Sequence, residues 1–131
     1  MSLGKVPTHL LYTKTHEWVR VDGDKVVIGI TDYAQSKLGD VVFVELPSTG
    51  DDFDAGLSLA TIESVKGVSD IYAPISGSVW EVNEELEDIP EYINEDPYGQ
   101  GWLLSLRIED QTELDDLLTA EEYQALLEDE E

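Results

Sequence analysis

The stretch LSLATIESVKGVSDIYA, residues 57–73, decides how the chain folds. Residues 57–63 alternate apolar and polar side chains, which is typical of a half-buried β-strand, and the β pattern resumes at residues 70–73. Between these two runs lies Lys66, followed directly by Gly67, and glycine is a common turn residue. The stretch therefore predicts a β-hairpin with Lys66 at or beside its tip.

Further short β runs lie on both sides of this hairpin. They cover residues 16–21, 25–30, 41–46, 78–82 and 102–108. An Asp-Gly-Asp turn separates the first two runs, and a proline ends the third. Thr31 suits the N-terminal cap of a short helix, and Gly39 suits its C-terminal end. The pattern predicts a mainly β protein with one short helix among its strands.

Two more helical regions are predicted towards the C-terminus. Within residues 86–97 apolar side chains recur at helical spacing, and Pro90 suits a helix start. Thr112 and Thr119 are each followed three residues later by an acid, which predicts the starts of two further short helices. The acids at the very end, residues 128–131, are expected to be loose.

A length of 131 residues fits a single domain. Within residues 1–131 we expect an N-terminal extension at 1–11, a β body at 12–108 and C-terminal helices at 112–128. No apolar run approaches the ~20 residues that a membrane span needs. The first residues also lack the features of a secretory signal or a transit peptide. We therefore expect a cytoplasmic protein, or one of an organelle matrix if a transit peptide has been removed.

The charge balance excludes several classes of partner. The chain carries 30 acidic and 7 basic residues, and its net charge of −23 repels nucleic acid and anionic membrane surfaces. From Glu109 to the end there are 11 acids and no base, which indicates either the solvated face of packed helices or an acidic partner-binding arm. There is no cysteine, so a disulfide and a thiolate nucleophile are both excluded. The two histidines lack the spacing of a metal site.

Lys66 is a basic residue within a long acidic stretch of the sequence. Between Lys37 and Arg107 the chain contains 15 acids and a single base, Lys66. A lysine at a hairpin tip can be an ordinary surface residue or the target of an acylating enzyme. Its unperturbed pKa of ~10.4 makes a free amine a weak nucleophile, so catalysis by Lys66 itself is not expected.

The residues around Lys66 resemble the lipoylation hairpin of the glycine cleavage system H-protein family. The matching residues are ESVK at 63–66, SDIYAP at 69–74 and SG at 76–77. Other matching stretches are HEWV at 16–19, GITD at 29–32, GDVVFVELP at 39–47, NEDPYG at 94–99 and GW at 101–102. The resemblance runs from about Tyr12 to Leu127. It implies a barrel-sandwich hybrid of the biotinyl/lipoyl type, with antiparallel sheets, short peripheral helices and a helical C-terminus.

The resemblance also implies a function. In this family a lysine, here Lys66, carries lipoic acid through an amide bond. The arm takes an aminomethyl group from glycine at the pyridoxal-phosphate-dependent P protein, delivers it to the folate-dependent T protein and is reoxidised by the flavin-dependent L protein. A lipoyl ligase or an octanoyltransferase attaches the arm. The implied protein is a carrier and not an enzyme, and we expect a monomer.

Three residues match positions that shelter the loaded arm in the family. They are Thr15, Glu17 and Asp70. A polar or protonated amine favours carboxylate and hydroxyl acceptors, and exclusion of water protects a labile group. From the residues alone, Glu17 can equally be a strand-surface acid and Asp70 a turn residue. Many relatives have histidine where this chain has Tyr33, and some have it at Lys37, so neither residue is included in the predicted site.

Three other interpretations remain. An H-like protein can act as a lipoyl relay that passes the group to other lipoate-dependent complexes, which the sequence does not separate from glycine cleavage. A biotin carrier usually places its lysine between two methionines, whereas the chain's one methionine is Met1. A purely structural acidic module would be indifferent to replacement of Lys66.

Overall fold

Two antiparallel sheets form the body of the protein, whose computed structural model describes residues 5–130. The larger sheet has the strand order β1-β2-β3-β9-β8-β5, and the smaller one has the order β4-β6-β7. Their bounds are β1 Leu11–Tyr12, β2 Glu17–Asp22, β3 Lys25–Ile30, β4 Val41–Glu45, β5 Asp52–Phe53, β6 Ser58–Ser64, β7 Gly67–Tyr72, β8 Gly77–Val82 and β9 Leu104–Ile108. This is the mainly β barrel-sandwich architecture, with peripheral helices, that the sequence predicts.

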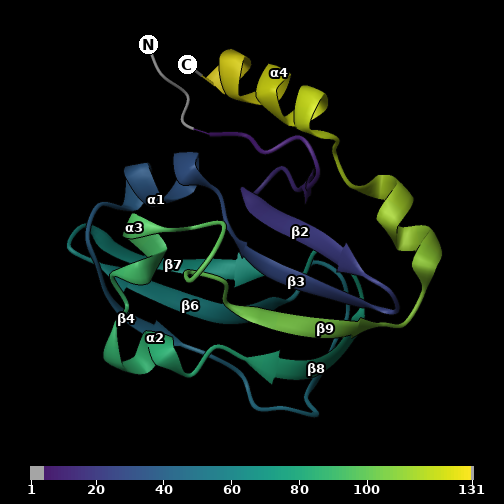
Figure 1. Ribbon diagram of the computed structural model, residues 1–131, viewed down its shortest axis with the longest axis horizontal. Coiled ribbons are helices and arrows are strands. Elements are labelled where there is room, and N and C mark those ends of the chain that lie inside the picture. The colour runs from purple at the N-terminus through teal and green to yellow at the C-terminus, as the bar shows by residue number, and fades with distance from the viewer. Residues whose placement is uncertain (1–4, 131) are drawn as a thin grey trace.

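The main core lies where the two sheets face each other (Figure 1). It consists of aliphatic side chains, because alternate residues of each strand point towards the opposite sheet. Fully buried members include Val26, Ile28, Ile62, Leu104 and Leu106. Burial of this aliphatic set stabilises the sheets that position the hairpin between β6 and β7.

Helix α1, Asp32–Leu38, follows β3 as predicted. The Thr31 hydroxyl accepts a hydrogen bond from the Ala34 amide at 3.2 Å, which caps the first turn. Gly39 ends the helix with a φ of +76°, a conformation that favours glycine. Both helix-end signals in the sequence are confirmed.

The region after β8 differs from the prediction. In place of one helix there are two, α2 at Glu85–Asp88 and α3 at Tyr92–Glu95. Ile89 ends α2 with φ −130° and ψ 69°, since a residue that precedes proline is disfavoured in the α conformation. The proline therefore divides the helical pattern, and Leu86 and Ile93 are both buried.

The first C-terminal helix also differs in type and start. It is the 3₁₀ helix η1, Gln111–Asp116, and its N-cap is Asp110, not Thr112. The Asp110 carboxylate accepts from the amide of Thr112 at 3.0 Å and from its hydroxyl at 2.6 Å. These bonds lower the pKa of Asp110. Thr112 is thus a donor to the cap and not the cap itself.

The last helix, α4 at Ala120–Glu130, covers a second and more aromatic cluster. The predicted capping box is present, because the Thr119 amide donates to the Glu122 carboxylate at 2.9 Å and the Glu122 amide donates to the Thr119 hydroxyl at 3.2 Å. The helix continues to Glu130, so residues 128–130 are helical and not loose, while residue 131 lies outside the described residues. The cluster contains Leu10, Tyr12, Trp18, Ala120, Tyr123 and Leu127.

Candidate functional site

The hairpin between β6 and β7 carries Lys66 in its turn. Ser64 and Gly67 are the last cross-strand pair, so Val65 and Lys66 alone form the turn, and β7 begins three residues before its predicted start. The Ser64 hydroxyl closes this turn, because it accepts from the Lys66 amide at 3.2 Å and donates to the Gly67 carbonyl at 3.4 Å. Gly67 has a φ of +145°, which a residue with a side chain rarely adopts.

The Lys66 side chain is exposed and lies over the end of α1. Its Nζ donates to the Lys37 carbonyl at 3.4 Å, and the Val65 amide donates to the Asp40 carbonyl at 3.0 Å. Gly39 permits this approach, since a Cβ there would lie 3.3 Å from Val65 Cγ2 and 3.5 Å from Lys66 Cε. No carboxylate within residues 5–130 forms an ion pair with Lys66. The amine is therefore exposed to solvent.

Several apolar side chains are exposed near the lysine, at the hairpin end of the smaller sheet. Phe43, Glu63 and Val68 form one cross-strand row. The exposed apolar residues at this end of the sheet are Val42, Phe43, Val65 and Val68.

A hollow of about 270 Å³ lies beside the hairpin, and we call it the near hollow. Its walls come from α1, the free edge of β7 and the loop before β2. They include Thr15, His16, Tyr33, Lys37, Ser69 and Asp70. The Asp70 carboxylate is exposed and accepts from the Ser58 hydroxyl at 3.1 Å. Asp70 is thus a residue of a strand and not of a turn.

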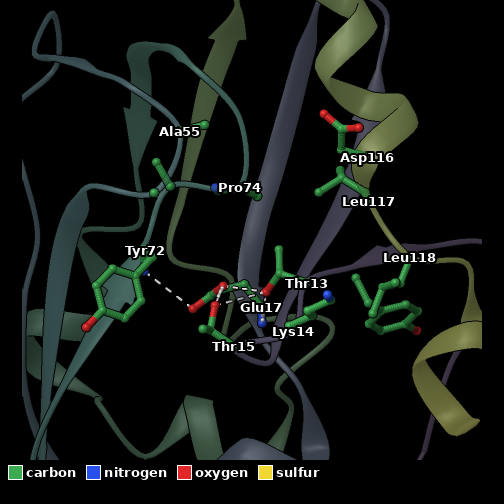
Figure 2. Close-up of a pocket in the computed structure, with 13 residues that line it drawn as sticks. Thr13, Lys14, Thr15, Glu17, Ala55, Tyr72, Pro74, Asp116, Leu117 and Leu118 are labelled. Carbon is green, nitrogen blue, oxygen red and sulfur yellow. Dashed lines mark hydrogen bonds between the residues drawn. The ribbon is translucent and has the colours of Figure 1, made fainter. Parts of the chain in front are cut away.

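A larger hollow of about 480 Å³ lies further along β7, and we call it the far hollow (Figure 2). Thr13, Thr15 and Glu17 line one side of it, next to Tyr72 at the end of β7. Pro74 and Leu117 contribute to its apolar walls. Thr15 lines both hollows, so the two adjoin at this residue.

Glu17 is a buried carboxylate at the edge of the far hollow, with a relative exposure of 1%. Its Oε1 accepts from the hydroxyls of Thr13 and Thr15, both at 2.5 Å, and its Oε2 accepts from the Tyr72 amide at 3.4 Å (Figure 2). The alternative that Glu17 is a strand-surface acid is therefore wrong. Because a carboxylate oxygen can accept two hydrogen bonds, Oε2 retains capacity for a further donor.

The predicted site residues are thus brought together in part. Thr15 contacts Glu17 directly, and Thr15 shares the near hollow with Asp70. Asp70 and Glu17 line different hollows and are not hydrogen-bonded to each other. The three residues follow one another along the free edge of β7, from the hairpin towards the far hollow.

Comparisons with known proteins agree with this arrangement. A model of the family described as Glycine cleavage H-protein matches residues 10–130. The chain belongs to the glycine cleavage H-protein family. It is 56% identical over 122 residues to the glycine cleavage system H protein of Staphylococcus carnosus, an alignment that covers 93% of this chain and 97% of that protein. It is also 56% identical over 129 residues to the H protein of Rubrobacter xylanophilus, covering 98% of this chain and 100% of that protein.

A solved structure of the same family supports the fold. The crystal structure of a glycine cleavage system H protein from Mycobacterium marinum superposes with a TM-score of 0.84 at 44% identity. The match covers 92% of this chain and 97% of the other. The sequence-based resemblance to the H-protein family is therefore confirmed, and with it a component of the glycine cleavage system. None of the helices within residues 5–130 is long and apolar enough to cross a bilayer.

The site of this H-protein family member also contains residues outside the set that the sequence predicts. Tyr33 and Lys37, the positions without histidine, both line the near hollow, and the Lys37 Nζ lies 5.3 Å from the centre of the Tyr33 ring. Thr13 is a second hydroxyl donor to Glu17. Thr13, Thr15 and Glu17 stand at every second position, and this spacing is the signal that could have identified Thr13. His16, which is not part of the predicted site, also lines the near hollow.

Proposed function

We propose that Lys66 carries lipoic acid as an amide on its Nζ, and that this chain is a non-catalytic carrier of the aminomethyl group of glycine between the P and T proteins, with reoxidation by the L protein. Family membership and one observation support the proposal: the exposed Lys66 amine stands at the tip of a short hairpin with no ion-pair partner within residues 5–130. When attached, the arm supplies the dithiol chemistry that a chain without cysteine lacks.

The reach of such an arm fits the two hollows. A lysine side chain extended by a lipoyl group spans about 14 Å from its Cα, given bond lengths of ~1.5 Å in a zigzag chain. An antiparallel strand rises about 3.4 Å per residue, so the four residues from Lys66 to Asp70 along β7 span roughly the same distance. An arm laid along the free edge of β7 therefore ends near Asp70 and Thr15, where the near hollow meets the far hollow.

In this proposal the chain's own residues shelter the end of the arm. The partly unsatisfied Oε2 of buried Glu17 accepts a hydrogen bond from the amine. The Thr15 hydroxyl holds Glu17 Oε1 in place at 2.5 Å, and Asp70 adds negative charge at the mouth of the near hollow. The apolar walls that include Leu117 exclude water from the carried group.

The position of Lys66 also indicates how a modifying enzyme would bind the chain. A lipoyl ligase or an octanoyltransferase must act at the Lys66 Nζ, and the apolar residues beside it, with Val68 the most exposed on β7, offer a surface that this enzyme can bury. Acylation removes one cation, so the net charge falls from −23 to −24. We expect a monomer, and a cytoplasmic location is supported by the bacterial origin of the relatives; a mitochondrial matrix location applies if a transit peptide has been removed.

The deciding experiment is glycine–bicarbonate exchange with a cognate P protein. Lipoylated wild-type chain should support the exchange, whereas Lys66→Arg, which keeps the charge and the fold, should support none. Exchange by the arginine variant would contradict the proposal. If the lipoylated wild type fails with an active P protein but transfers its lipoyl group to another acyltransferase domain, the chain is the lipoyl relay and the glycine-cleavage role is wrong.

A further inference from the structure

The hydroxyl of Tyr123 on α4 contacts residues that border the near hollow. We call the near hollow and the far hollow together the arm cleft, or cleft. The Tyr123 hydroxyl lies 2.8 Å from Nδ1 of His16 and 2.7 Å from Oγ1 of Thr31. His16 lines the near hollow, and Thr31 caps α1, which forms another wall of that hollow. Burial raises the pKa of Tyr123, so the hydroxyl keeps its proton in neutral solution. One phenol therefore joins two walls of the cleft to the C-terminal helix.

The donors in this network can all be satisfied at once. Thr31 Oγ1 accepts from the Ala34 amide, which leaves its own hydrogen for Tyr123, and the Tyr123 hydrogen then points to His16 Nδ1. The other ring nitrogen, Nε2, lies 3.3 Å from a carboxylate oxygen of Glu130 at the end of α4. Two hydrogen bonds thus connect the cap of α1 through Tyr123 to His16, and a close contact with Glu130 links the His16 ring to the end of α4.

His16 is held in an unusual backbone conformation. Its φ is +72°, the one positive value among the non-glycine residues within residues 5–130, and this conformation costs about 1 kcal/mol or more for a residue with a side chain. Contacts of the ring offset this cost, because Tyr33 packs at 4.9 Å and Tyr123 packs edge-on at 5.7 Å between ring centres. The ring, and not the backbone preference, keeps His16 in place.

The conformation of His16 sets the direction of the loop that presents the threonines. The His16 amide donates to the Thr13 carbonyl at 3.2 Å, and the Thr13 amide donates to the Glu17 carbonyl at 3.0 Å. This tight reversal turns the hydroxyls of Thr13 and Thr15 towards the Glu17 carboxylate (Figure 2). A shift of the His16 ring would therefore act on Thr15, its direct neighbour, because the Thr13 hydroxyl is also held by the Glu17 amide at 3.1 Å.

We propose that Tyr123 is a positioning residue for the arm cleft: its hydroxyl, through His16, fixes the loop of residues 13–16 so that Thr15 and Glu17 meet the end of the arm. The role of this cleft rests on the proposed function above, but the positioning itself does not require an attached arm. The C-terminal helix is thereby part of the cleft's construction, although it lies more than a hundred residues from the loop in sequence.

The first test uses the full chain without its lipoyl group. Tyr123→Phe removes the hydroxyl and keeps the ring. Tyr98→Phe is the matched control, because the Tyr98 hydroxyl also makes two hydrogen bonds: it accepts from the Asp32 amide and donates to the Lys5 carbonyl. Tyr98 lines neither hollow. Relative to a core amide of β6, the amides of His16 and Thr31 should exchange hydrogen about fivefold to tenfold faster in Tyr123→Phe, as expected for one lost buried hydrogen bond, and less than twofold faster in the control. Equal rates in both variants would overturn the proposal.

The second test uses lipoylated protein loaded by P protein and glycine in the absence of T protein. Ammonia release from Tyr123→Phe should be at least about threefold faster than from Tyr98→Phe, with lipoylation by mass unchanged, because a displaced Thr15 shelters the amine less well. His16→Asn, which tolerates a positive φ, should behave like Tyr123→Phe, and the two changes together should add little. If Tyr123→Phe accelerates amide hydrogen exchange but the lipoylated wild-type chain cannot be loaded with the aminomethyl group at all, the positioning role holds and the proposed function fails. Equal release rates in a loadable protein would overturn the link to the arm.

Discussion

The hairpin tip and the buried end of the cleft are built in opposite ways. At the tip, Lys66 is exposed, and its turn is held by a few hydrogen bonds from Ser64 and from the end of α1. At the other end, Glu17 is 1% exposed, and its carboxylate is held by three donors, two from the loop before β2 and one from β7. An attachment point needs access for several enzymes, whereas a sheltering site needs fixed geometry. The difference predicts that changes at the tip affect chemistry, and changes at the buried end affect stability as well.

The largest effect on stability is expected beside Glu17, at Trp18. This ring is fully buried, donates to the Pro97 carbonyl at 2.9 Å and packs directly on Gly29. Trp18→Ala should lower the free energy of unfolding by about 3–5 kcal/mol in urea titrations. Trp80, which is 45% exposed beneath Lys25, is the matched control, and its replacement by alanine should cost less than about 1 kcal/mol. Similar losses of stability in both variants would contradict the view that the buried end of the cleft is fixed by core packing.

A smaller loss is expected for Glu17→Gln. The amide nitrogen of glutamine cannot accept the bonds that Thr13, Thr15 or the Tyr72 backbone donates, so one of them is left buried and unpaired. The free energy of unfolding should fall by about 1–3 kcal/mol. Glu63→Gln near the tip removes an exposed carboxylate and should change it by less than about 0.5 kcal/mol. An unchanged melting curve for Glu17→Gln would show that the carboxylate is not held as described.

High pH should also lower the free energy of unfolding, through the aromatic cluster beside the cleft. Burial raises the pKa of Tyr12, Tyr98 and Tyr123, that of Tyr98 to about 12, and all three belong to or pack against the aromatic cluster. The folded state thus favours the protonated phenols. Their contribution to stability is complete below the unfolded pKa of about 10 and is lost as the pH rises through 12. Urea titrations between pH 9 and about 12 should show falling stability, with a shallower slope for Tyr98→Phe; a flat profile would contradict this.

The smallest effect on stability is expected at the tip itself. Lys66→Arg should leave the free energy of unfolding within about 0.5 kcal/mol of the wild type, because the side chain is exposed and makes one long hydrogen bond. Thermal melting of both proteins checks this directly. A loss comparable to that of Glu17→Gln would mean that Lys66 is part of the folded core and not a free attachment point.

Local patterns in the sequence predicted most of the fold. The hairpin, the strand of residues 25–30 and the two ends of α1 depend on neighbouring residues, and the structure confirms them. The predictions failed where a second local effect competed with the first. Ile89 precedes a proline and so ends α2, and Asp110 is the N-cap of η1 because it lies at the position from which a carboxylate can accept the Thr112 amide.

The candidate site was less predictable, because its contacts span the chain. The Glu17 carboxylate accepts from the Tyr72 amide, 55 positions away, and from two threonine hydroxyls of the loop before β2. The contact of His16 with Tyr123 joins residues 107 positions apart. No periodicity in the sequence encodes such pairs, whereas Lys66 lies within ESVK at 63–66, one of the stretches that carry the family resemblance.

The most direct test of the account is the mass of the peptide that contains Lys66 after the chain is produced with an active lipoyl ligase and lipoic acid. We expect one lipoyl group on the Lys66 Nζ, and none on the six other basic residues or on the Lys66→Arg chain. A chain that stays unmodified at Lys66 while another lipoyl protein in the same cells is modified, or that carries the group on a different lysine, would contradict the central claim.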